Sequence, residues 1–288
     1  IEGVEPLRTK MASSAAHVTR KKLISSESAT WLNEHFESNL SDIKVAIDRF
    51  FVNGVNHIFY HGTSYSPPKE AWPGWLFYAA VHVNPRNSLW KDFDALNKYI
   101  ERSQSFLQHS KPDNDVLLYF PIYDRFSAPG KEMIEHFDGI GTQFDNTAFK
   151  ASAEWMLEKG YAFDYISDKQ IGNIVLSNGK LKTEGNSFYK TIILPHAEFI
   201  PLTTLRKILA LAEEGATVIA FKGLPASVSG YHNALKNKKT FDDMISRVKA
   251  AGKDVQGIKE CKLGKGMILE GDDLNQLLTY AAVRRETM

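Results

Sequence analysis

DVLLYFP (115–121) is a run of apolar residues with no polar alternation, which is typical of a strand buried on both faces of a parallel sheet. FYKTIILP (188–195) and ATVIAF (216–221) have the same character. Helical patterns at 147–160 and 201–215 separate these strands, and each ends in a glycine. The alternation of buried strands and helices predicts an open three-layer α/β domain over residues 111–288.

The residues before this domain also alternate between predicted strands and helices. The polar, proline-containing stretch HSKPDND (109–115) is the best linker in the chain and sets a first domain at 1–110. Residues 40–51 and 89–108 carry apolar side chains at helical spacing. Three short strands are predicted there: MASSAAHV (11–18), KKLISS (21–26) and VNHIFYHG (55–62).

Composition limits the classes of function. The chain has 288 residues, 43% hydrophobic and 24% charged, with a net charge of +1 and a pI near 7.9. This balance gives no electrostatic case for a nucleic acid or an anionic membrane as partner. No apolar run is long enough to span a bilayer. Cys261 is the single cysteine, so neither a disulfide nor a cysteine-based metal site is expected.

Polar side chains at predicted strand ends are the candidates for chemistry, because parallel α/β folds place their sites there. Glu27 follows the strand 21–26 among small hydroxyl residues, which would leave room for a ligand. It could equally be the acid at the start of a helix, with the neighbouring serines as caps. His17 and His61 end the other two strands, and structural hydrogen bonding is an alternative for both. No HExxH spacing supports a metal site.

Trp72 and Trp75 lie on the loop after the strand 55–62. They could form a flat platform for a sugar ring or pack as a lid. In the second domain, HAE (196–198) and FKGLP (221–225) follow buried strands, where an open sheet would bind a ligand. Neither contains a nucleotide-binding motif. An active amidotransferase would need a cysteine or serine on an elbow after a strand, but ILPHAEF has His196 there and Cys261 lies far along in a polar segment.

Four stretches together carry a family resemblance: TWLNEHF (30–36), GVNHIFYHGTSYSP (54–67), WPGWLFYAA (72–80) and NDVLLYFPIYD (114–124). The sequence resembles the glycoside hydrolase family 106 α-L-rhamnosidases over essentially its whole length. The resemblance implies the C-terminal part of a (β/α)8 TIM barrel at 1–110, followed by a flavodoxin-like domain similar to class I glutamine amidotransferases. The strand carrying Glu27 would then be the seventh of the barrel, and 11–18 the sixth.

The same resemblance implies roles for the candidate residues. Glu27 would be the general base of an inverting glycosidase, with His17, His61, Trp72 and Trp75 shaping the sugar site. The general acid would lie on the fourth barrel strand, upstream of Ile1, so the chain alone is expected to have little or no activity. Calcium, a rhamnose-containing plant-type polysaccharide as substrate, and a secreted or periplasmic location for the parent protein all rest on resemblance alone.

Other classes of function remain open. The chain could be a non-catalytic structural or interaction unit, or part of another exo-glycosidase such as a β-galactosidase. The open edges of a partial barrel also predict association into a homo-oligomer.

Overall fold

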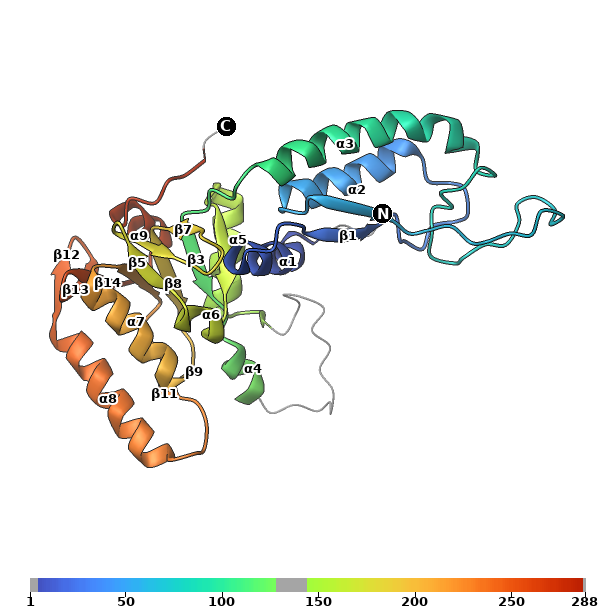
Figure 1. The fold of residues 1–288 in the computed structure, drawn as a ribbon. Coiled ribbons are helices and arrows are strands. Elements are labelled where there is room, and N and C mark those ends of the chain that lie inside the picture. The colour runs from blue at the N-terminus through green and yellow to red at the C-terminus, as the bar shows by residue number, and fades with distance from the viewer. Residues whose placement is uncertain (1–4, 128–143, 287–288) are drawn as a thin grey trace. The chain divides into compact units, whose positions relative to one another are not determined.

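The computed structural model describes residues 5–127 and 144–286 (Figure 1). The chain divides into two compact units, and each is described by itself. The first contains Lys21–Lys111 and the residues up to Ala16, and the second contains His17–Arg20 and everything from Pro112 onward. The predicted boundary at residues 110 and 111 lies beside this division.

The first unit is built around two short parallel strands. β1 and β2 pair in a register that sets Glu27 beside Phe59. The helix α2 connects the two strands along the chain, so β1, α2 and β2 form one βαβ unit. The elements of this part of the chain are α1 (Pro6–Thr19), β1 (Ser25–Ser28), α2 (Leu40–Val52), β2 (His57–Tyr60), the 3-10 helix η1 (Ser88–Asp92) and α3 (Phe93–His109).

Local signals explain why α2 begins and packs as it does. The Asn39 side chain accepts from the Asp42 amide while the Asp42 carboxylate accepts from the Asn39 amide, which satisfies both free donors at the helix start. Ile43 and Ile47 are fully buried and pack with Phe93 of α3 in one apolar cluster. The two helices therefore shield the β1–β2 pair from one side.

The strand predicted at 11–18 is wrong. These residues form the second half of the helix α1. Alanine has the highest helix propensity and the segment is rich in alanine and serine, with Val18 as its one β-branched residue. Its short apolar pattern does not distinguish a strand from a helix. A sixth barrel strand at this position is therefore contradicted.

The second unit is organised by a seven-stranded sheet of order β12-β13-β14-β10-β8-β3-β4. The five strands from β14 to β4 are parallel, and β12 and β13 extend that sheet as antiparallel strands. Numbered along the chain, the parallel strands have the order 2-1-3-4-5, the order of flavodoxin-like doubly wound sheets. The strands of this sheet are β3 (Val116–Tyr119), β4 (Phe163–Ile166), β8 (Thr191–Pro195), β10 (Thr217–Phe221), β12 (Gly252–Val255), β13 (Ile258–Leu263) and β14 (Gly266–Gly271).

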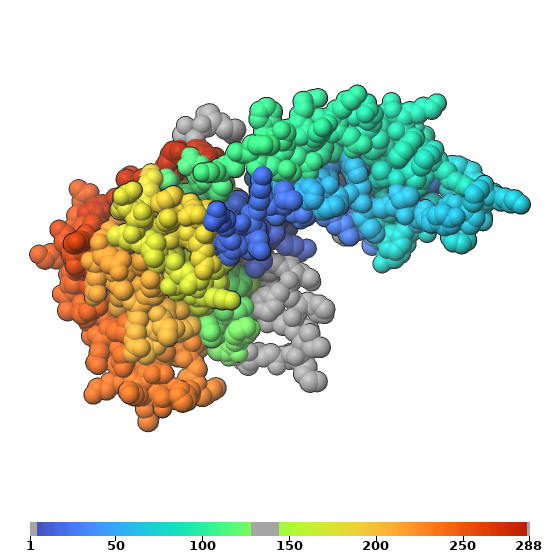
Figure 2. All heavy atoms as spheres, in the orientation of Figure 1, coloured from blue at the N-terminus to red at the C-terminus, as the bar shows by residue number. Residues whose placement is uncertain are grey.

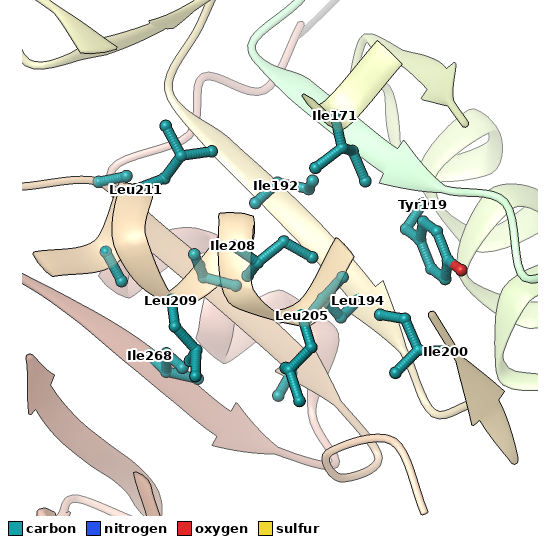
Figure 3. Close-up of a cluster of buried hydrophobic side chains, with 14 of the residues drawn as sticks. Tyr119, Ile171, Ile192, Leu194, Ile200, Leu205, Ile208, Leu209, Leu211 and Ile268 are labelled. Carbon is teal, nitrogen blue, oxygen red and sulfur yellow. The ribbon is translucent and has the colours of Figure 1, made fainter. Parts of the chain in front are cut away.

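Helices cover both faces of this sheet. A row of aligned residues across it, Leu117, Ile192, Val218 and Ile268, belongs to one buried cluster. Side chains of α7, such as Leu205 and Ile208, close over this row (Figure 3). Buried residues of α5 and α9 lie outside that cluster, and these helices contact β3, β8 and β14. The helices are α4 (Ile122–Ser127), α5 (Ala148–Lys159), α6 (Asp168–Gly172), α7 (Leu202–Glu214), α8 (Ala234–Ala250) and α9 (Leu274–Tyr280).

Two small sheets complete this unit. The predicted Asn-Gly hairpin is present: Asn178 and Gly179 both have positive φ and connect β5 to β6. The third strand of this sheet, β7, pairs with β6. The small strands are β5 (Val175–Ser177), β6 (Lys180–Lys182), β7 (Phe188–Tyr189), β9 (Phe199–Ile200) and β11 (Ser227–Val228).

Candidate active site

Glu27 lies inside the strand β1, and its side chain is exposed. Its neighbours Ser26 and Ser28 point to the opposite, buried face, as the alternation of a strand requires. The next helix begins only at Leu40 and has Asn39 as its cap. The interpretation of Glu27 as a helix-start acid is therefore wrong, and the carboxylate is available to solvent.

One hydroxyl joins Glu27 to His61. Thr30 Oγ1 lies 3.1 Å from Glu27 Oε2 and 3.1 Å from His61 Nδ1. Because Thr30 has a single proton, it donates to the carboxylate and accepts from Nδ1–H of a His61 in that tautomer. The chain from imidazole to hydroxyl to carboxylate leaves His61 Nε2 as an acceptor.

The backbone brings these side chains together. The His61 amide donates to the Ser28 carbonyl at 2.8 Å, which extends the pairing of β1 and β2 by one residue. Both side chains thus stand at the carboxyl end of the pair. Phe77 packs its ring edge-to-face on His61, with 5.0 Å between the ring centroids, and restricts the orientation of the imidazole. Sequence analysis missed Thr30, because its role depends on the strand register.

The aromatic loop after β2 exposes both predicted tryptophans. Trp72 is 69% and Trp75 55% exposed, so neither is packed as a core residue. The Trp72 indole donates to the Arg86 carbonyl at 3.1 Å and stacks on Phe36 with 5.5 Å between centroids. The Arg86 guanidinium in turn donates to the carbonyls of Glu70 and Ala71. The loop therefore holds exposed flat rings on a braced backbone.

A histidine pair lies in the same unit and escaped the sequence analysis. His82 is fully buried, and its Nε2 is 2.7 Å from Nδ1 of the exposed His35. Its own Nδ1 has no hydrogen-bond partner among the described residues. Burial, with the nearby His35, holds the pKa of His82 below its ordinary value, which favours the neutral ring. The Phe36 ring lies 5.1 Å from the His82 ring, so this pair supports the aromatic loop through Phe36.

His17 has a different environment from the other candidates. It lies in the last turn of α1, within the second unit. Its Nδ1 lies 3.0 and 3.1 Å from the two oxygens of Asp164, which is fully buried on β4. The structure thus links Glu27 and His61 through Thr30, whereas His17 contacts a carboxylate within the second unit.

Within residues 5–127 and 144–286, no group of three or more His, Cys, Asp or Glu side chains converges on one point. No helix in this part of the chain is long and apolar enough to cross a bilayer.

A family model described as α-L-rhamnosidase, glycoside hydrolase family 106, matches residues 5–287. The chain belongs to this family. The resemblance seen in the sequence is confirmed. This family 106 chain is also 28% identical over 214 residues to a putative beta-glucuronidase of Formosa agariphila, a match covering 74% of the chain and 16% of that protein.

Solved structures agree in fold. A rhamnosidase from Novosphingobium sp. PP1Y superposes with a TM-score of 0.69 at 20% identity, covering 98% of the family 106 chain and 25% of that structure. A beta-galactosidase from Bacillus circulans sp. alkalophilus has a TM-score of 0.53 at 10% identity, covering 98% and 48%. The chain thus spans a quarter of the rhamnosidase and less than half of the galactosidase. These likenesses establish a mixed α/β fold shared with glycosidases.

Proposed function

We propose that this chain contributes the general base and part of the sugar site of an inverting α-L-rhamnosidase. The observation that supports it best is the position of Glu27: an exposed carboxylate at the carboxyl end of a parallel strand pair, hydrogen-bonded through Thr30 to His61. Active sites of parallel α/β barrels occupy this end of their strands. The β1–α2–β2 repeat is proposed to be the last part of such a barrel, with residues 111–288 as the amidotransferase-like accessory domain.

In this mechanism the Glu27 carboxylate takes a proton from water as the water oxygen bonds to the anomeric carbon. The bond from that carbon to the leaving oxygen breaks, and the leaving oxygen takes a proton from a second carboxylic acid. Inverting enzymes hold the two carboxyl groups roughly 6.5–9.5 Å apart to fit the water. Thr30 keeps the Glu27 side chain oriented by its hydrogen bond, and His61 fixes the Thr30 hydroxyl.

The second carboxylic acid is proposed to come from outside residues 1–288, because this chain spans only 25% of the rhamnosidase it superposes on. Trp72 and Trp75 are proposed to stack on the sugar, since both are exposed and held on a braced loop. His17 was included in the sugar site on resemblance, but its contact with Asp164 supports a structural role instead. A rhamnose-containing plant polysaccharide as substrate, and a secreted or periplasmic location, are part of the same proposal.

Substitution of Glu27 in the full-length protein tests the base. Glu27→Gln keeps size and hydrogen-bonding capacity but cannot accept the proton, so kcat on an aryl α-L-rhamnoside is expected to fall by about 10²-fold or more. Glu37→Gln, an exposed glutamate ten positions further along, serves as the matched control and is expected to retain wild-type rate. Activity of Glu27→Gln within a few-fold of wild type would refute the role of Glu27.

Added azide gives a second readout. A nucleophilic anion needs no general base, so azide is expected to restore turnover in Glu27→Gln and to yield a glycosyl azide of inverted configuration. A product of retained configuration would show that Glu27 is not the base of an inverting enzyme.

The aromatic platform is tested by binding. Trp72→Ala is expected to weaken rhamnose binding by about 0.5–1.5 kcal/mol, the usual contribution of an aromatic stack. Calorimetric titration of the full-length protein would measure it, with Tyr231→Ala, a 99% exposed aromatic of the second unit, as control. Equal rhamnose affinity in wild type and Trp72→Ala would remove Trp72 from the sugar site.

A further inference from the structure

A cavity of about 530 Å³ lies at the carboxyl ends of β8, β10 and β14, within the second unit. Its floor comes from the loops after β8 and β10, which contribute His196 and Lys222, and from Glu270 near the end of β14. Its outer wall is the helix α8, through Asp242 and Lys249. Figure 2 shows α8, in orange, at the surface of this unit. The two loops are the HAE and FKGLP segments that the sequence marked as ligand positions in an open sheet.

Two lysines and two carboxylates line this cavity, and each carboxylate is also paired with a lysine outside the lining. Asp242 forms an ion pair with Lys238, one turn earlier on α8. Glu270 Oε2 lies 3.5 Å from Lys259 Nζ on the neighbouring strand β13. Both carboxylates therefore have a cation of their own. Lys222 and Lys249 have no carboxylate within ion-pair distance among the described residues. The cavity is left with the positive charge of two lysines.

The backbone holds Lys222 in an unusual conformation. Its φ is +61°, a region that residues with a β-carbon seldom adopt, and Gly223 follows with φ of +110°. The turn is tied down because the Lys222 amide donates to the Gly271 carbonyl at 2.9 Å. This sharp turn after β10 places the loop 222–226 along the cavity instead of continuing the strand. Strained residues held this way concentrate at ligand sites.

His196 adds an imidazole ring whose orientation is already fixed. Its Nδ1 donates to the Leu224 carbonyl at 3.2 Å, which fixes the ring against the loop and leaves Nε2 for another partner. The ring is exposed and lines the cavity. When protonated, Nε2–H is a third cationic donor beside the two lysines.

We propose that this cavity is a binding site for a small anionic ligand that carries a carboxylate or a phosphate group. Lys222 and Lys249 would bind the charged group from the loop and from α8, and His196 in its protonated form would donate a hydrogen bond to it through Nε2–H. The site belongs to the second unit alone and is independent of the function proposed for Glu27. Glu270, held by Lys259, would face the uncharged part of the ligand, where hydroxyl groups can donate to it.

Isothermal titration of the full-length protein at low salt tests the proposal. The probes are inorganic phosphate and glucuronate, with glucose as a neutral control. At least one anion is expected to bind, with an affinity that falls as salt is raised, while glucose does not bind at this site. Tighter binding of phosphate would identify a phosphate ester as the ligand class, and tighter binding of glucuronate would identify a sugar acid.

Three variants assign the binding to this cavity. Lys249→Gln and Lys222→Gly are each expected to weaken anion binding at least tenfold, and Lys236→Gln, an exposed lysine of α8 outside the cavity, is expected to leave it unchanged. Glycine suits positive φ, so Lys222→Gly is expected to keep the wild-type melting temperature or raise it. Loss of binding in that variant therefore cannot come from unfolding. No anion binding by the wild type, or equal binding by all variants, would overturn the proposal.

Discussion

Two carboxylates on parallel strands, Glu27 of β1 and Asp164 of β4, have opposite surroundings. Asp164 is fully buried and accepts from the Tyr189 hydroxyl at 2.8 Å and from the Asn114 amide at 2.7 Å, and it also contacts His17. Glu27 is exposed, and it accepts a hydrogen bond from the Thr30 hydroxyl at 3.1 Å. One carboxylate has its hydrogen-bonding capacity occupied by the protein, whereas the other keeps most of it for a ligand.

Both carboxylates have a histidine nearby, so the histidine does not distinguish them. Their burial and hydrogen bonding do: Asp164 is suited to a structural role, and Glu27 is accessible to a ligand. A buried carboxylate surrounded by donors stabilises the fold. Burial, together with Asp164, raises the pKa of the Tyr189 hydroxyl above its ordinary value. Removing it leaves several buried groups without partners. An exposed carboxylate contributes little to stability, so its removal changes only what happens at its surface.

The largest expected effect is therefore on stability, at Asp164. Asp164→Ala removes the carboxylate that accepts from the buried Tyr189 hydroxyl and from the partly buried Asn114 side-chain amide, and the free energy of unfolding is expected to fall by about 3–5 kcal/mol. Glu27→Gln is expected to change it by less than about 0.5 kcal/mol. Urea denaturation of both variants, followed by fluorescence, measures the contrast. Similar losses in the two variants would contradict it.

A smaller effect is expected at Thr30, in activity and not in stability. Thr30→Val keeps the shape of the side chain but removes the hydroxyl between Glu27 and His61. One lost hydrogen bond corresponds to about 0.5–1.5 kcal/mol, so kcat in the full-length protein should fall about two- to tenfold with little change in KM. Thr30→Ser, which restores the hydroxyl, is expected to recover most of the rate. A rate equal to wild type in Thr30→Val would show that the hydroxyl does not orient Glu27.

Sequence patterns predicted the second unit better than the first. Its strands are continuous apolar runs such as VLLY (116–119), and burial on both faces leaves few alternatives to such a run. The α/β class is confirmed, whereas the antiparallel strands β12 and β13 were missed because their alternating charged residues do not look buried. In the first unit, alanine-rich 11–18 had no pattern that separates strand from helix, and it proved to be α1.

The candidate site could also be predicted only in part from the sequence. Glu27, His61, Trp72 and Trp75 could be selected from the sequence because strand ends and exposed aromatics have recognisable signals. The hydroxyl of Thr30 and the bracing by Arg86 could not, since both depend on which backbone atoms the fold brings together. The contact of His17 could not be predicted for the same reason, because its partner Asp164 is 147 positions away in the sequence.

Asp168 is intermediate in burial between Asp164 and Glu27. Its substitution is expected to have the smallest of the predicted effects, a pH-dependent change in stability. Asp168 is the partly buried first residue of α6, and its Oδ1 accepts from the Tyr119 hydroxyl at 3.0 Å and from the Thr204 hydroxyl at 2.6 Å. Burial raises the pKa of this carboxyl above its usual value despite the two donors. The native state therefore holds its proton more tightly than the unfolded chain, whose pKa is about 3.9.

Stability should accordingly decrease as the pH rises from the unfolded pKa through the folded pKa of Asp168, and the cost should persist at neutral pH. Asp168→Asn keeps an oxygen acceptor for both hydroxyls and removes the charge, so it should be at least as stable as wild type at pH 7. At pH 3, where the wild-type carboxyl is already neutral, the two proteins should unfold alike. Urea midpoints across this pH range measure the difference. If Asp168→Asn is less stable than wild type at neutral pH, the charge of Asp168 stabilises the fold, as is expected for Asp164, and the prediction is wrong.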